Sequence, residues 1–117
     1  VFDGAICFSF YPIDVHDKHG VEPRHLSEGI VPTVPLRALI PKNSQNLLVA
    51  GRCVSSDRLA NSALRVQASC MAMGQAAGAS AALAILQKAT PLNVSLQGIK
   101  ETLVDNGAIV PGVDFKK

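Results

Sequence analysis

A run of 22 residues from Val66 to Gln87 carries no charged side chain, and no other feature limits the fold of this chain as strongly. Alanine dominates the run, no proline interrupts it, and Thr90-Pro91 follows it. The sequence therefore predicts one long helix over about residues 63–89. Because a helix without a charged face is typically buried on all sides, we expect it to lie inside a larger protein or a membrane.

The composition of this run argues against a membrane span. Few of its residues are Leu, Ile, Val or Phe, and most are Ala, Gly, Ser and Gln, which contribute little to bilayer insertion. Gly74 and Gly78 form a GxxxG pattern that Ala82 extends, and such small residues let another backbone approach closely. We therefore expect a helix packed against other protein, and no membrane span.

A chain of 117 residues has room for one domain, but few elements remain to surround so long a helix. Two expectations stay open. The chain forms a homo-oligomer through the Gly74/Gly78/Ala82 face, or another part of the same protein buries the helix. The sequence starts at Val1 without an initiator methionine, so we expect the chain to be a piece of a longer protein.

The overall composition excludes several classes of protein. Hydrophobic residues make up 48% and charged residues 17% of the chain, which excludes a disordered polypeptide. A net charge of +2 is too small to indicate nucleic acid as a partner. Cys7, Cys53 and Cys70 have apolar neighbours and no metal-ligand spacing. We therefore expect no metal site, and three cysteines that cannot all pair favour a reducing compartment such as the cytoplasm.

Three further segments have the composition of β-strands. They are residues 2–11, 30–39 and 47–50. Prolines limit the second segment to a sheet edge or an extended connector, and the unbroken apolar run LLVA in the third fits a strand buried on both faces. A second helix is predicted at 95–105, with Ser95 as its N-cap and Asn106-Gly107 at its end.

Residues 14–29 contain all three histidines and are predicted to form a loop or irregular hairpin. His16 lies between Asp14 and Asp17, and flanking carboxylates suit a histidine for acid–base catalysis. We therefore take His16 as the candidate catalytic residue, with a structural or solvated role as the alternative. The spacing of His16, His19 and His25 matches no standard metal site.

The stretch from Asn46 to Gly78 has the layout of an anion site. A strand that leads into a helix N-terminus places free amides and the positive end of the helix dipole together. Gly51 allows close approach of a ligand to the backbone, and Arg52, Arg58 and Arg65 offer charge-assisted hydrogen bonds. The same residues also fit an ordinary strand–turn–helix unit with solvated arginines.

The stretch NLLVAGRCVSSDRLANSALRVQASCMAMGQAAGASAALA resembles the C-terminal signature of FAD-dependent oxidoreductases of the two-dinucleotide-binding-domain type. The segments YPIDVHD at 11–17 and VPLRALIPK at 34–42 are similar to the approach to that signature, so the resemblance covers about residues 11–88. It implies an α/β fold, the C-terminal part of a Rossmann-like FAD/NAD(P)-binding domain. Residues 1–42 would end a substrate or cap domain and return to the FAD-binding domain, which residues 43–117 would complete.

The resemblance also implies a set of cofactor-binding residues. Gly51 and Arg52 would lie near the ribityl chain or pyrophosphate of FAD. The start of the long helix, at Arg65, Val66 and Gln67, would direct free amides at the flavin pyrimidine edge, where negative charge develops on reduction.

A GxGxxG motif is absent from the sequence, so the expected partner is an N-terminal half of the same enzyme that contains it. In the intact enzyme, FAD would carry a hydride or electron pair from an unidentified small-molecule substrate. The chain alone would retain FAD poorly or not at all. The alternative is a small helical self-association module with no enzymatic activity.

Overall fold

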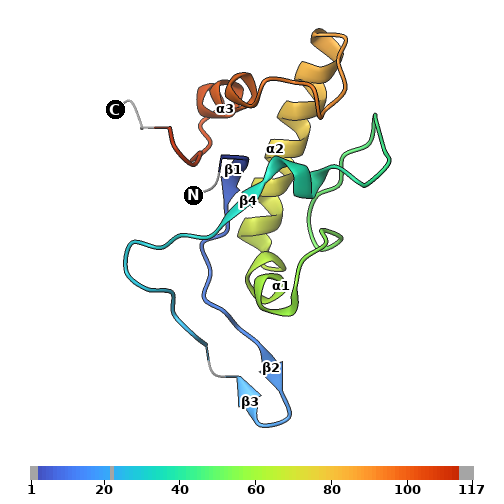
Figure 1. Ribbon diagram of the computed structural model, residues 1–117. Coiled ribbons are helices and arrows are strands. Elements are labelled where there is room, and N and C mark those ends of the chain that lie inside the picture. The colour runs from blue at the N-terminus through green and yellow to red at the C-terminus, as the bar shows by residue number, and fades with distance from the viewer. Residues whose placement is uncertain (1–2, 22, 114–117) are drawn as a thin grey trace.

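The computed structural model describes residues 3–21 and 23–113, so the parts of our expectations that concern residues 2 and 114–117 lie outside them. Within these ranges the fold is a mixed α/β arrangement of three α-helices, one 3-10 helix and two short antiparallel sheets. Helix α2 (Gln67–Leu86) is the central element, with β1 and α3 packed against it and α1 at its N-terminal end (Figure 1).

The single helix predicted over 63–89 is wrong at its start. The structure has a short helix α1 (Arg58–Leu64), which begins before the predicted start, and then the separate helix α2. Asp57 starts α1 because its carboxylate accepts the Ala60 N–H at 2.8 Å. Val66 separates the two helices, since its backbone is extended at φ −75° and ψ 152°, a conformation that β-branched residues favour.

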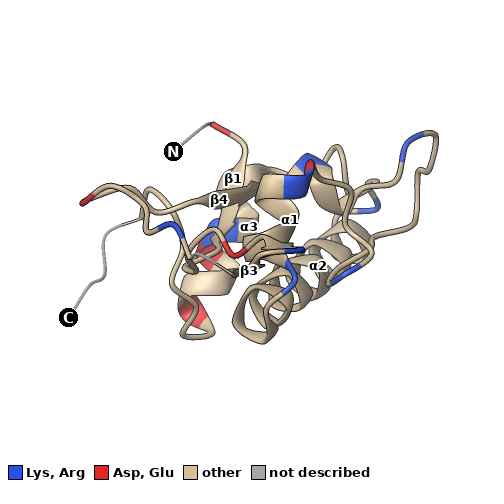
Figure 2. Ribbon diagram, turned by 90° about the horizontal axis from the view of Figure 1, so that it is seen from below, with Lys and Arg blue, Asp and Glu red and all other residues tan. Residues whose placement is uncertain are grey.

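Within the described chain α2 is buried on one face, so its burial on all sides by other protein stays a prediction. One face is buried, by Ser69, Met73, Ala76, Ser80 and Ala84. The opposite face, which includes Gly74, Gly78 and Ile85, is exposed although no charged residue lies on the helix (Figure 2). The described part of the chain therefore covers α2 on one side only.

The main sheet is shorter than the sequence predicts. Strand β1 (Ala5–Phe8) pairs antiparallel with β4 (Thr33–Pro35), with an irregularity in register between Ala5 and Cys7. Residues 36–39, expected to continue the second strand, form the 3-10 helix η1 (Leu36–Leu39) instead. Prolines at 32 and 35 have no N–H to donate to a ladder, and this limits the pairing.

The strand expected at 47–50 is absent from the structure. The Val49 N–H donates to the Leu39 carbonyl at 2.8 Å, but no strand of the described chain pairs with this segment. Leu47 is 52% exposed. A strand exists only with a neighbour that satisfies its backbone groups, so an apolar run with the right composition stays irregular here.

The second predicted helix is confirmed as α3 (Leu96–Asp105). Ser95 caps it by accepting the Gly98 N–H at 3.3 Å, and Gly107 follows its end at φ +78°. Ile99 and Leu103 are buried in the core against α2. The capping residue and the glycine that predicted α3 from the sequence therefore mark its two ends in the structure.

The histidine-containing segment forms the irregular hairpin that the sequence predicts. Strands β2 (His16–Asp17) and β3 (Gly20–Val21) pair antiparallel at the tip of a long excursion between β1 and β4 (Figure 1). Ile13 and Arg24 exchange backbone hydrogen bonds of 3.0 and 2.8 Å between this tip and the rest of the molecule. The hairpin carries His16 to the end of the molecule where α1 lies.

Candidate functional site

Gly51 forms a tight turn beside the first turn of α2. Its backbone has φ +90°, a conformation that favours glycine, and its carbonyl accepts the Val54 N–H at 3.1 Å. A Cβ at this position would lie 4.0 Å from the Cys70 Sγ. Arg52 follows on the turn with an exposed side chain. The structure thus brings two of the predicted cofactor-binding residues next to the helix start.

The N-terminus of α2 has no side-chain cap. Its N-cap residue is Val66, which cannot cap through its side chain, and the first hydrogen bond runs from the Cys70 N–H to the Val66 carbonyl at 3.0 Å. The amides of Gln67 and Ala68 therefore have no acceptor within the helix, and both residues are exposed. These groups and the helix dipole make the turn suited to an electron-rich ligand atom.

The backbone amide of Arg65 does not have the role that we expected from the sequence. Its N–H donates to the Asn61 carbonyl at 3.1 Å, because the residue is the C-cap of α1 and not the first residue of α2. This amide is already used and does not point freely at a ligand. Any contribution of Arg65 to a site comes from its guanidinium group.

Two buried serines fix the position of the α2 N-terminus. The Ser9 and Ser69 hydroxyl oxygens are 2.9 Å apart and lie 3.4 and 3.3 Å from the Ala63 carbonyl oxygen. Each hydroxyl has one hydrogen, so one donates to the other and the second donates to the Ala63 carbonyl. These bonds join the end of β1, the last turn of α1 and the first turn of α2. A buried polar cluster of this kind holds its elements in one arrangement because each hydroxyl needs its partner.

The Arg65 side chain contacts the segment that contains the candidate catalytic histidine. Its Nη2 lies 3.2 Å from the Asp14 Oδ2 and 3.3 Å from the Asp14 carbonyl oxygen. The His16 Nε2 lies 3.6 Å from the same Oδ2. Asp14 thus joins His16 and Arg65, two residues that we selected from the sequence for separate reasons.

The three cysteines are free thiols. Burial raises the pKa of Cys7 from 9.0 to about 11, so this thiol is protonated and inert at neutral pH. Cys53 is exposed and donates to the Ala50 carbonyl at 3.3 Å, next to the Gly51 turn. Within residues 3–21 and 23–113, no group of three His, Cys, Asp or Glu side chains is placed to hold a metal ion.

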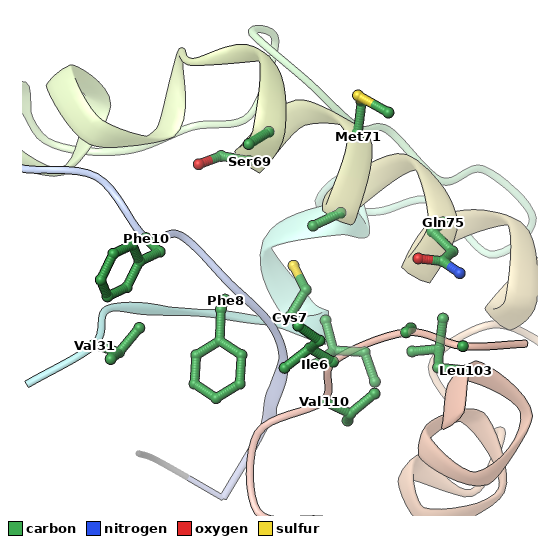
Figure 3. A pocket seen from close by; sticks show the side chains of 15 residues that line it. Ile6, Cys7, Phe8, Phe10, Val31, Ser69, Met71, Gln75, Leu103 and Val110 are labelled. Atoms are coloured by element: carbon green, nitrogen blue, oxygen red, sulfur yellow. The ribbon is translucent and has the colours of Figure 1, made fainter. Parts of the chain in front are cut away.

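An apolar cavity of about 690 Å³ borders the same end of α2. Figure 3 shows Phe8, Phe10 and Val31 along one side of it, with Ser69 of α2 and Leu103 of α3 on the other sides. Phe10 is 80% exposed. An open apolar surface of this size is typical of a ligand or interaction site.

Among the described residues, α2 is the one helix that is long and apolar enough to cross a bilayer, with a mean hydropathy of 1.4 over its most apolar window. Core helices of soluble proteins can have the same length and composition.

A model of the FAD dependent oxidoreductase family matches residues 1–103 of the 117. The chain belongs to the FAD dependent oxidoreductase family. This confirms the resemblance drawn from the sequence, and it makes the protein a flavoprotein oxidoreductase in kind, with FAD as the cofactor that the family suggests. No curated protein and no solved structure matches the chain.

The chemistry of these residues suits an anionic group such as those that FAD carries. The α2 N-terminus has no side-chain cap, and Gly51 presents bare backbone 4.0 Å from Cys70 in the first turn of that helix. Arg52 adds an exposed guanidinium group on the same turn. Arg65 and His16 form a second group around Asp14.

In the sequence, Asp14 is recognisable only as a neighbour of His16. The structure makes it the acceptor for Arg65 as well, from a position 51 residues away in the chain. No local pattern reveals such a pairing. The paired serines Ser9 and Ser69 were missed for the same reason, since they are 60 residues apart.

Proposed function

We propose that this chain is the C-terminal part of the FAD-binding domain of an FAD-dependent oxidoreductase and that it completes the flavin site. The observation that carries the proposal is the juxtaposition of the Gly51 turn with the uncapped N-terminus of α2. In a domain of Rossmann-like type, an N-terminal half with a GxGxxG motif would bind most of the pyrophosphate. Residues 43–117 would then close the site from the other side.

The unpaired segment 47–50 supports a missing neighbour. Its apolar composition suits a strand buried on both faces, yet it has no strand partner among the described residues and Leu47 is exposed. A strand from the other half of the domain would satisfy its backbone groups and bury its side chains. The Gly51 turn would then follow directly from the end of a paired strand.

The uncovered face of α2 supports the same interpretation. Gly74 and Gly78 are exposed, and a Cβ at either position would meet no atom within 4 Å. Met71 and Ile85 are 68% and 78% exposed on a helix without charge. We propose that the rest of the domain packs on this face, because so much apolar surface is unfavourable in water.

The chain's own residues would act on FAD by binding and by electrostatics. FAD supplies the electron-accepting ring system. The amides of Gln67 and Ala68 at the positive end of α2 would stabilise negative charge on a bound group. Gly51 would allow that group to approach the backbone, and Arg52 would donate charge-assisted hydrogen bonds to it.

The proposal is tested by the visible spectrum of the protein after excess FAD is added and removed by desalting. We expect the longer gene product to be yellow and the 117-residue chain to be colourless, because the chain holds only one side of the site. In the longer protein, Arg52→Ala should lower the flavin content, while Arg37→Ala, at an exposed position on η1, should not. A colourless longer protein would contradict the proposal.

A second candidate function rests on the same uncovered helix face. A small self-association module without enzymatic activity would use Gly74, Gly78 and Ala82 as its contact surface. This candidate predicts a stable homo-oligomer whose contact Gly78→Leu disrupts, together with no flavin in any form of the protein. The family match favours the flavoprotein.

A further inference from the structure

A second cavity, of about 360 Å³, opens between residues 14–16 and helix α1. Most of the side chains that line it carry positive charge or hydrogen-bond donors: His16, Arg58, Arg65, Asn61 and Ser62. Asp14 lies in the same wall. No residue of the Gly51 turn lines this cavity. Arg65 links the cavity to α2, because only Val66 lies between Arg65 and the first residue of the helix.

Hydrogen bonds hold the wall of this cavity in place. The Asp14 N–H donates to the Ser62 Oγ at 3.1 Å, and the Ser62 hydroxyl donates to the Leu59 carbonyl at 2.7 Å. Arg65 contacts both the carboxylate and the carbonyl of Asp14. Asp14 is therefore a positioning residue that fixes a guanidinium group and an imidazole at one side of the cavity.

One oxygen in this wall has no donor. The Asp14 Oδ1 is buried without a hydrogen-bond partner among the described residues, although Oδ2 contacts Arg65 and His16. A buried carboxylate oxygen without a donor is rare in folded proteins. Oδ1 is buried and does not open to the cavity, so Asp14 acts on the cavity through Oδ2 and the contact of that oxygen with Arg65.

The charge in the cavity selects the kind of anion. Arg58 and Arg65 contribute two positive charges and Asp14 one negative charge, so these three side chains together carry one net positive charge. The Nη2 of Arg58 donates to the His16 carbonyl at 3.3 Å, which orients the group and leaves other N–H donors for a ligand. One carboxylate balances this charge, whereas a pyrophosphate exceeds it.

We propose that this cavity binds the carboxylate of the substrate, and that the substrate is a small carboxylic acid. Arg58 and Arg65 bind the carboxylate, and the rest of the substrate lies toward His16 and Asn61. The inference rests on the proposed function, because it names the substrate class of that oxidoreductase. The shared chemistry is an anionic oxygen group, which FAD could also supply through its pyrophosphate.

Binding of sodium lactate and of inorganic pyrophosphate to the full chain, followed by NMR, tests the proposal without any enzymatic reaction. We expect lactate to shift the His16 ring and arginine side-chain signals saturably, and pyrophosphate not to compete at equal concentration. Arg58→Gln should weaken lactate binding by about tenfold or more, since a hydrogen bond to a charged group is lost. Asn61→Asp should abolish it by adding negative charge, and Arg37→Gln is the matched control.

The outcomes separate this inference from the proposed function. Lactate binding that Arg58→Gln and Asn61→Asp weaken, with Arg37→Gln unchanged, supports the inference even if the chain alone retains no FAD. No saturable lactate binding in a folded chain overturns it, while flavin in the longer protein still supports the oxidoreductase. Pyrophosphate that displaces lactate, together with loss of flavin in the Arg58→Gln longer protein, assigns the cavity to the cofactor and also overturns the inference.

Discussion

Single residues at the α1–α2 junction determine how the candidate site is built. Val66 breaks the helix, and this break leaves the amides at the start of α2 without a side-chain cap. Gly51 contributes by what it lacks, since its left-handed backbone and missing side chain keep the surface beside α2 open. Asp14 contributes by a contact, because its carboxylate joins Arg65 and His16.

Gly51→Ala is expected to lower the free energy of unfolding by about 1–2 kcal/mol, because a non-glycine residue is strained at φ +90°. Gly74→Ala is the matched control. Gly74 lies within α2 with nothing near a new Cβ, so alanine there should raise helix stability by up to about 1 kcal/mol. Urea denaturation measures both, and equal effects of the two changes would contradict the role of the turn.

The buried thiol of Cys7 makes stability depend on pH in the alkaline range. Below pH 9.0 the thiol is protonated in both the folded and unfolded chains, and its contribution does not change. Between pH 9.0 and about 11 only the unfolded chain ionises, so the free energy of unfolding falls as the pH rises. The slope from this group approaches about 1.4 kcal/mol per pH unit.

Other parts of the chain also respond to alkaline pH, so the test compares variants. The fall in unfolding free energy from pH 9 to 11 should be smaller in Cys7→Ala than in the unchanged chain, whereas Cys53→Ala at an exposed position should retain the full slope. Chemical denaturation at a series of pH values provides the measurement. Parallel slopes for all three proteins would show that Cys7 is accessible to water.

At the scale of elements, α2 has one packed face and one open face. Met73 and Ala76 on the packed face are fully buried, and β1 and α3 lie against this side of the helix. The glycines of the GxxxG pattern lie on the open face, where no side chain of the described chain would meet a Cβ. The two faces therefore predict opposite responses to the same kind of substitution.

Ala76→Leu should destabilise the chain by about 1–3 kcal/mol, because a larger side chain overpacks a full core. Gly78→Leu should leave the melting temperature of the isolated chain unchanged or higher, since leucine favours a helix more than glycine does. In the longer enzyme or in an oligomer, the same Gly78→Leu should destabilise by more than about 1 kcal/mol, because the face is then covered. Equal destabilisation of the isolated chain by both changes would show that the open face is already packed.

In the molecule as a whole, the described residues leave several apolar surfaces uncovered. The apolar cavity, Leu47 of the unpaired segment 47–50 and the open face of α2 are all exposed in a fold with extents of 51 × 38 × 21 Å. Phe10, Ile85 and Leu86 are each at least 77% exposed. Such surface is typical of a protein whose partner is absent.

The isolated chain is therefore expected to self-associate as its concentration rises, and sedimentation velocity measures this. Ile85→Lys should reduce the association by placing a charge on the open face of α2. Leu92 is also exposed but lies outside α2, so Leu92→Lys is the control and should reduce the association less. Co-expression with the proposed N-terminal half of the FAD-binding domain should replace self-association by a complex of defined size. A chain that stays monomeric at high concentration would contradict this expectation.

Features that depend on a few neighbouring residues follow from the amino-acid sequence. The bounds of α3 follow from Ser95 and Gly107, the irregular hairpin from the turn residues of 14–29, and the turn at Gly51 from the glycine that ends the apolar run 47–50. Capping, helix propensity and turn formation are local, so their signals lie within one or two helical turns. The resemblance to FAD-dependent oxidoreductases likewise rests on one continuous stretch.

Features that need a distant partner become apparent only in the folded chain. The segment 47–50 has the composition of a strand but no strand beside it, and α2 has the composition of a fully buried helix but cover on one side. The Asp14–Arg65 contact joins residues 51 apart. Burial and pairing depend on what lies alongside a segment in space, and a side chain carries no record of which distant residue that will be.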